Sequence, residues 1–141
     1  MSRSPAARLR ARAAFREEHH RELAAARRLV LQRFTFTYVA SVGPAVARVI
    51  AIYRAQHGRG PSWSDLGQEL AVGEARVLPP PPAEASTRLA VAWNRAAASA
   101  AMPMLRAAGW VEYDRQPHSL RPGPRWSGYE KDLIGQDLSS R

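Results

Sequence analysis

Polar side chains able to recognise a nucleic acid lie within the helix-like stretch between residues 83 and 108. The guanidinium groups of Arg88 and Arg95 can donate paired hydrogen bonds to guanine, and the amide of Asn94 can pair in the same way with adenine. Ser99 adds a hydroxyl to this stretch. These residue types indicate contacts with base edges, although each of them also suits a solvated helix face.

A second set of polar groups surrounds the start of a predicted short helix. The hydroxyl of Ser62 can accept the free backbone N–H three residues further on, and Asp65 completes the S-x-x-D pattern of a capping box. The free N–H groups at such a helix start, together with Ser64, can bind a phosphate. A helix cap is the simpler role for Ser62, and both roles are compatible.

A third set is basic and lies in a predicted hairpin. The residues are Arg115, His118 and Arg121. Basic hairpin tips contact phosphates or the minor groove in many DNA-binding proteins. By contrast, the large aromatic residues Tyr53, Trp63, Trp93 and Trp110 each fall on an apolar face, which favours a core position over base stacking.

The overall charge agrees with a polyanionic partner. Arg and Lys number 21 against 12 Asp and Glu, which gives a formal net charge of +9. Such a surplus is self-repelling unless a polyanion neutralises it, and nucleic acid fits better than an anionic membrane surface. No uninterrupted apolar run approaches the roughly 18 residues of a membrane span, so no membrane is expected as a partner.

Several kinds of chemistry are not supported by the sequence. The absence of cysteine excludes disulfides, thiolate catalysis and cysteine zinc sites. His19 and His20 point to different sides of a helix and do not form an H-E-x-x-H pair, so no metal is expected. There is no Gly-rich phosphate loop, nucleophile elbow or acid pair. We therefore expect a protein that is not an enzyme and holds no cofactor.

The N-terminal region is rich in helix-forming residues. Ala, Leu, Arg and Glu predict one long helix over residues 5–33, with a stripe formed by Leu23, Ala26, Val30 and Phe34. This basic helix is interpreted as a solvated helix, a dimerisation element or an arm on phosphates. Residues 34–42 alternate like a strand, but they can also end the preceding helix.

A second helical block follows Gly43-Pro44, because proline suits a first helical position. Its half-buried face contains Val46, Val49, Ile50 and Tyr53, and it stops at Gly58. The short capped helix then runs from Ser62 to near Gly73. Residues 73–83 contain four consecutive prolines and are expected to form an extended insertion within the domain.

The last helix and the hairpin complete the predicted order. Residues 83–108 are predicted to be helical, with a kink or break caused by Pro103. Gly109 ends this helix, and strands are expected at 110–113 and 118–121 around a turn at 114–117. The polar tail has Leu133, Ile134 and Leu138 as anchors, for which a short docking helix and disorder are both open.

This order of elements resembles a winged helix-turn-helix. The stretch VARVIAIYRAQHGRGPSWSDLGQEL (46–70) is similar to the start of the DNA-binding domain of LexA-type repressors, and MLRAAGWVEYDRQPHSLRPG (104–123) is similar to the third helix and wing of LexA-like and MarR-like regulators. Two features depart from those families: the proline-rich insertion at 73–83 and Pro103 within the third helix. A LexA-type Ser-Lys protease domain is not implied, because Lys131 is the only lysine.

The predicted organisation is a basic N-terminal helix or arm (1–42), a winged helix-turn-helix domain (43–125) and a polar tail (126–141). The resemblance implies a sequence-specific double-stranded DNA-binding protein, a transcriptional regulator. We expect it to form a homodimer through the long N-terminal helix or the tail. The alternative is a phage, plasmid or nucleoid assembly protein that binds DNA with little specificity. The first fifteen residues resemble a mitochondrial transit peptide, but the helical pattern continues beyond them, so a cytoplasmic, nucleoid-associated location is expected.

Overall fold

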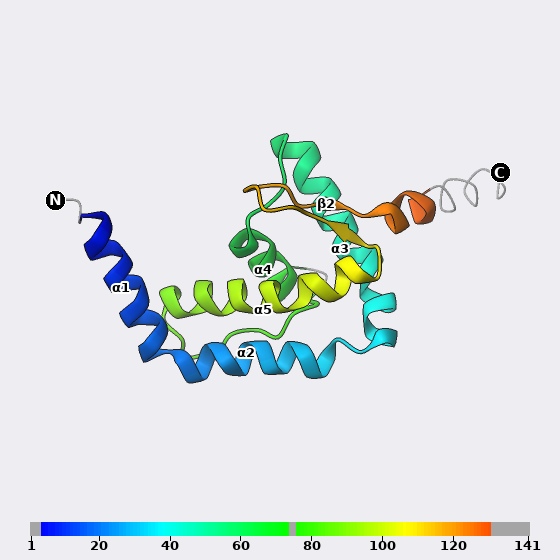
Figure 1. Ribbon diagram of the computed structural model, residues 1–141. Coiled ribbons are helices and arrows are strands. Elements are labelled where there is room, and N and C mark those ends of the chain that lie inside the picture. The colour runs from blue at the N-terminus through cyan, green and yellow to red at the C-terminus, as the bar shows by residue number, and fades with distance from the viewer. Residues whose placement is uncertain (1–3, 74–75, 131–141) are drawn as a thin grey trace.

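The computed structural model describes residues 4–73 and 76–130, and it is mainly helical (Figure 1). The elements in chain order are α1 (Pro5–Glu18), α2 (His20–Arg33), α3 (Phe36–His57), α4 (Trp63–Val72), α5 (Thr87–Ala107), β1 (Val111–Glu112) and β2 (Arg121–Pro122). Residues 124–130 are also helical. The strands form a two-stranded antiparallel sheet. The expected mainly helical fold with a small hairpin is confirmed at this level.

The predicted single helix over residues 5–33 is wrong, because the chain bends at His19 between α1 and α2. His19 leaves helical geometry, with φ −106° and ψ 22°. Leu23 and Ala26 of α2 pack against α5. Because α5 begins near this bend, it does not extend alongside α1, and α1 has no buried residue (Figure 1). Helix propensity continues across His19, whereas the packing surface ends there.

Residues 34–42 form neither a strand nor the end of the preceding helix; most of them begin α3. The hydroxyl of Thr35 accepts the N–H of Tyr38 at 3.2 Å and caps the new helix. The helix start predicted at Gly43-Pro44 is also wrong, since Pro44 lies inside α3. Its missing N–H leaves the carbonyl of Ala40 without a helical partner, but residue 40 is exposed and water can bond there.

Gly43 does not mark the predicted boundary before a new helix; it lies within α3 and allows close packing. It is buried, and a Cβ at this position would overlap the indole ring of Trp110. Trp110 follows α5 in the chain and is 5% exposed. The missing side chain of Gly43 therefore allows α3 to lie directly against the base of the hairpin.

The main core lies among α2, α3, α4, α5 and the hairpin. Its largest fully buried side chains are Ile50, Leu66, Leu70, Leu78, Met102, Leu105, Val30, Val46, Val77 and Val111. A second cluster joins α2 to the first half of α5 through Leu23, Ala26, Leu89, Trp93 and Ala96. The predicted stripe on residues 23, 26, 30 and 34 is confirmed as buried, as are Trp93 and Trp110, while Trp63 and Tyr53 are half-buried.

The proline-rich segment between α4 and α5 is held against the body of the protein. Val77 and Leu78 are 1% exposed. The hydroxyl of Tyr38 donates to the carbonyl of Val77 at 2.7 Å, and the indole N–H of Trp93 donates to that of Pro79 at 3.0 Å. The extended segment predicted within 73–83 therefore contributes side chains to the core.

α5 is continuous through Pro103, so the predicted break is wrong. Proline at 103 removes the hydrogen bond to the carbonyl of Ser99, which lies on the exposed side of the helix where water can replace it. Ser86 caps α5 by accepting the N–H of Leu89 at 3.1 Å. α5 is thus one uninterrupted helix from Thr87 to Ala107.

The hairpin is shorter than predicted and has a longer loop. Val111 pairs with Pro122 and Glu112 with Arg121, so the expected strand at 118–121 is wrong except for its last residue. His118 has φ 60°, a left-handed conformation that an extended strand does not allow. Of the tail, residues 126–130 continue the helix that begins at 124, and the anchors predicted at 133, 134 and 138 lie outside the described residues.

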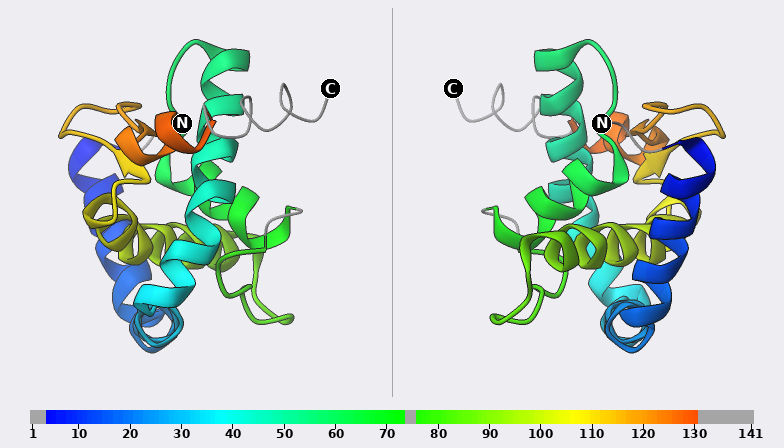
Figure 2. Two further views of the ribbon diagram at one scale, coloured as in Figure 1. Left: turned by 90° about the vertical axis from the view of Figure 1, so that its right-hand side faces the viewer. Right: turned by 90° about the vertical axis from the view of Figure 1, so that its left-hand side faces the viewer.

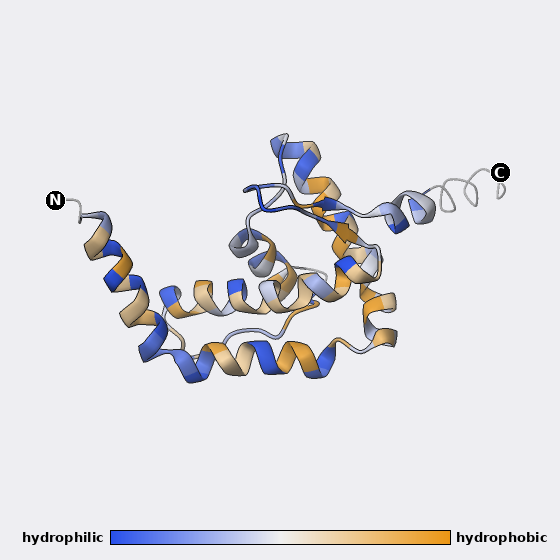
Figure 3. Cartoon of the chain, in the orientation of Figure 1, coloured by the Kyte–Doolittle hydropathy of each residue, from blue (hydrophilic) through white to orange (hydrophobic). Residues whose placement is uncertain are grey.

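One described helix, α3, is long and apolar enough to cross a membrane by length and composition alone. Five of its residues are buried within the protein: Val39, Gly43, Val46, Ala47 and Ile50. Hydropathy colouring shows this apolar character on the first half of α3, whereas the second half of α2 alternates between hydrophobic and hydrophilic residues (Figure 3). A core helix of this kind passes the same test as a membrane span.

Candidate nucleic-acid interface

One face of α5 is exposed along its length. Arg88, Val91, Arg95 and Ser99 recur every three or four residues and are all exposed, while the opposite face is buried against α2 and α4. At a rise of 1.5 Å per residue this stripe extends over about 16 Å. Three of the four side chains predicted as base readers therefore share one solvent-facing line on a rigid helix.

The fourth predicted reader, Asn94, is not on this face. It is 6% exposed and lies where α4 crosses α5, since a Cβ at Gly67 would overlap the backbone carbonyl of Asn94. Its side-chain Oδ1 is buried with no hydrogen-bond partner among the described residues. The prediction for Asn94 is corrected: a polar residue type suggested exposure, but the helical phase places it beside Trp93 on the inner side.

Val91 occupies the place on the stripe that was assigned to Asn94. It is 49% exposed between Arg88 and Arg95. Sequence reasoning passed over it because it selected residues by polarity. The spacing 88, 91, 95 and 99 is the signal that identifies it, since this is the spacing of one helix face.

The start of α4 lies next to this stripe. The hydroxyl of Ser62 accepts the N–H of Asp65 at 3.1 Å, which confirms the predicted cap. The carboxylate of Asp65 accepts a bond from the hydroxyl of Tyr53 at 3.3 Å. Ser64 is half-buried in the first turn, where the N–H groups at the helix end carry a partial positive charge.

The hairpin loop is fastened to the turn that precedes α4. The ring Nδ1 of His118 lies 2.9 Å from the carbonyl oxygen of Gly60, and the N–H of Gly60 donates to the carbonyl of His118 at 3.1 Å. Because a carbonyl only accepts, Nδ1 carries the hydrogen in this contact. Arg54 also donates to the carbonyl of Leu120 at 3.0 Å. His118 is therefore a residue that positions the loop.

Two further contacts give the loop a defined shape. The N–H of Asp114 donates to the hydroxyl of Ser119 at 3.0 Å, and the N–H of Gln116 donates to the Asp114 carboxylate at 2.7 Å. Asp114 is the only acid in the loop between the strands, and its carboxylate stabilises the turn by accepting this hydrogen bond. Arg115 is exposed at the tip, and Arg121 is exposed on β2 with its guanidinium donating to the carbonyl of Ser119 at 3.1 Å.

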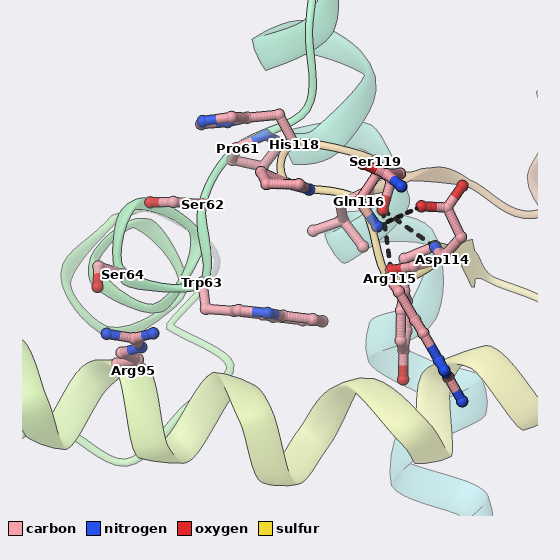
Figure 4. A pocket seen from close by; sticks show the side chains of 13 residues that line it. Pro61, Ser62, Trp63, Ser64, Arg95, Asp114, Arg115, Gln116, His118 and Ser119 are labelled. Atoms are coloured by element: carbon pink, nitrogen blue, oxygen red, sulfur yellow. Dashed lines mark hydrogen bonds between the residues drawn. The ribbon is translucent and has the colours of Figure 1, made fainter.

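The start of α4, the loop and α5 enclose a groove of about 330 Å³. Five of the predicted residues line it: Ser62, Ser64, Arg95, Arg115 and His118. Figure 4 shows Arg95 rising from α5 towards Ser64 of α4, with the loop residues on the far side of Trp63. Arg88, Ser99 and Arg121 lie outside the lining of the groove.

Trp63 and Tyr113 hold the two sides of the groove together. Their rings meet edge to face with centroids 5.2 Å apart. Tyr113 also lies under the guanidinium of Arg106, which is 4.6 Å from the ring centre and pairs with Glu112 at 3.0 Å. Tyr113 was not selected from the sequence, although its place at the end of WVEY could have indicated a ring facing α4.

Among the described residues, no group of three or more His, Asp and Glu side chains is placed to hold a metal ion. No protein-family model, curated protein or solved structure matches this chain. The lining of the groove combines two arginines, three serine hydroxyls and the start of α4 with the rings of Trp63 and Tyr113 and the carboxylate of Asp114.

Proposed function

We propose that this protein is a sequence-specific double-stranded DNA-binding protein, a transcriptional regulator built as a winged helix-turn-helix. In this proposal α3, α4 and α5 are the three helices, α5 is the recognition helix, and the hairpin is the wing. The observation that carries it is the exposed stripe of α5 beside a groove formed by the start of α4 and the hairpin loop. In the proposal these three adjoining elements form the contact surface.

The stripe suits the edges of base pairs. An α-helix fits the major groove, and about 16 Å of helix face spans about five base pairs at 3.4 Å each. Arg88 and Arg95 offer paired donors for guanine, and the exposed methyl groups of Val91 between them suit the methyl group of thymine. Ser99 adds a hydroxyl at the end of the stripe.

The groove suits the sugar-phosphate backbone. Ser62 and Ser64 stand at a helix start whose N–H groups favour an anion, and Arg115 lines the groove from the loop on the other side. The fixed loop geometry reduces the ordering cost of these contacts, because His118 and Gly60 already hold the loop in place. Arg121 adds a cation on β2.

The homodimer belongs to the same proposal. Exposed apolar side chains of the N-terminal region lie near the junction of α2 and α3: Leu29 is 43% exposed, Leu31 62% and Phe36 87%. A symmetric contact between two copies would remove this apolar surface from water. Light scattering of the wild type should give a dimer mass, and L31E/F36E should give a monomer mass; an unchanged mass would reject this corner as the contact.

Selection of bound duplexes from a random pool tests the function. The wild type should enrich a motif, and its affinity for that motif should fall steeply between 50 and 200 mM salt because bound counterions are released. R95A should cost about 1–3 kcal/mol and relax one position of the motif. R48A, with the same charge change on an exposed residue of α3, is the matched control and should keep the motif.

Two results would contradict the proposal. Binding with equal affinity to the selected and random duplexes, combined with a large assembly in solution, would favour the alternative of an assembly protein with little sequence specificity. No duplex binding at any salt concentration would reject DNA as the partner.

A further inference from the structure

We infer that α1 is a phosphate-binding arm, which lies along the DNA backbone beyond the end of the recognition helix and does not join two copies of the chain. This inference rests on the proposed function. It concerns a helix that the groove does not use. The juxtaposition that carries it is an arginine-rich helix, without a single buried residue, beside the start of the exposed stripe of α5.

α1 is fixed to the body of the protein by its last turns. Ala7, Ala11 and Phe15 are its half-buried residues, and they share one face at a spacing of four. The guanidinium of Arg88 lies 4.2 Å from the centre of the Phe15 ring, and the ring of His19 lies 4.5 Å from it. These contacts place the C-terminal half of α1 beside the residue where the stripe of α5 begins.

The rest of α1 is charged and exposed. Between Ser4 and Arg16 the sequence holds four arginines and no acid, and all four arginines are exposed: Arg8, Arg10, Arg12 and Arg16. Arg8, Arg12 and Arg16 follow one another at i, i+4 spacing, at which like charges repel and destabilise an isolated helix. A row of phosphates would remove this repulsion.

A second copy of the chain is a poor partner for this surface. Leu9, at 64% exposure, is the one large apolar side chain exposed on α1. Stable symmetric interfaces have an apolar centre, and a two-fold contact would place the arginines of one α1 against those of the other. The exposed apolar residues that suit a dimer lie instead near the junction of α2 and α3; they are Leu29, Leu31 and Phe36.

The position of α1 fits a duplex that already contacts α5 and the hairpin. In Figure 1, α1 rises at the N-terminal end of α5, while the hairpin loop lies over α4 further along; both views of Figure 2 place α1 and the tip of the hairpin on the same side of the molecule. With 14 residues, α1 is about 21 Å long, a length of about six base pairs. Arm and hairpin would thus contact the backbone on either side of the groove that α5 enters.

The test compares two variants that lose the same charge. R8Q/R12Q removes two cations from α1, and R27Q/R48Q removes two from exposed positions on α2 and α3. Binding to the selected duplex is measured by fluorescence anisotropy from 50 to 300 mM salt. We expect R8Q/R12Q to bind at least about tenfold more weakly at the lowest salt and to lower the slope of log K against log salt by about 1.8, at 0.9 per phosphate.

The control should keep a slope close to that of the wild type. Hydroxyl-radical footprinting should show that R8Q/R12Q loses protection at one end of the site only, and R8K/R12K should restore it because the charge is retained. Circular dichroism checks that the variants keep their helix content.

The outcomes separate the arm from the function. If the wild type binds the duplex and R8Q/R12Q binds with the same slope and footprint, the arm is rejected and the proposed function stands. If R8Q/R12Q changes the mass in solution, α1 is a dimer contact and the inference is overturned. If the wild type binds no duplex but binds vesicles of phosphatidylserine and phosphatidylcholine, both the arm on DNA and the proposed function fail.

Discussion

α1 and α2 are similar in composition but have opposite roles in the structure. Both are 14-residue helices rich in Ala and Arg, and they follow one another across a single bend. α2 buries Leu23, Ala26 and Val30, whereas α1 buries nothing. The difference arises from what lies beside each helix: α2 packs along α5, and α1 extends beyond its end (Figure 1).

This contrast shows that helix formation and helix burial are separate properties of a sequence. Ala and Arg favour a helix in both segments, because their side chains lose little freedom there. Burial depends on an apolar stripe and on a surface that receives it. α2 has both, and α1 has a half-buried face of two alanines and one phenylalanine at its edge.

The largest expected effect comes from placing a charge on the buried face of α2. In A26R, the arginine would have to enter the cluster of Leu23, Leu89 and Trp93 from a position with no exposure, so we expect a loss of more than about 3 kcal/mol in the free energy of unfolding. Urea unfolding followed by circular dichroism measures it.

The matched change on α1 is A13R. Residue 13 is exposed, so the free energy of unfolding should stay within about 0.5 kcal/mol of the wild type. Equal losses in A13R and A26R would show that α1 is packed like α2 and would remove the distinction between the two helices.

An intermediate effect is expected when α1 is removed. A chain lacking residues 1–18 loses the contact between Phe15 and Arg88 but no buried residue of α1, so its unfolding free energy should fall by about 1 kcal/mol or less. Its affinity for the selected duplex should fall more, by about tenfold or beyond, because the deletion removes five arginines against two glutamates and with them the inferred phosphate contacts. A collapse of stability with unchanged affinity would reverse the roles assigned to α1.

The smallest effect is expected at the cap of α1. The hydroxyl of Ser4 accepts the N–H of Ala7 at 3.1 Å, so S4A should cost α1 about 0.5–1 kcal/mol of local stability. Amide hydrogen exchange should become faster in the first turns of α1 and stay unchanged in α2. Faster exchange throughout both helices would mean that they fold as one unit.

Features set by neighbouring residues were predicted from the sequence. The Ser62 cap, the helix end at Gly58 and the stripe of α2 depend on side chains within a few residues of one another. Arg88, Arg95 and Ser99 were chosen by polarity and are exposed as expected, whereas the helical spacing that would have excluded Asn94 was not used. Such local hydrogen bonds and spacings can be identified without knowing the rest of the fold.

Features set by distant residues were not predictable in this way. Asn94 is buried where Gly67 lets α4 approach α5, and residue 43 of α3 has no room for a side chain because Trp110 fills the space beside it. His118 takes a left-handed conformation that suits its contacts with Gly60, 58 residues away. Each of these outcomes depends on a partner that the spacing of nearby residues does not identify.

The central claim is that the exposed stripe of α5, the groove beside it and α1 form one surface for double-stranded DNA. Chemical-shift mapping of the amides, with the selected duplex added to the labelled protein, tests it most directly. We predict the largest shifts along α1 and at five residues of the stripe and the groove: Arg88, Val91, Arg95, Ser64 and Arg115. Ile52 of α3 and Val72 of α4, which are exposed away from this surface, should change little. Shifts concentrated at Ile52 and Val72, or none at any of these residues, would contradict the claim.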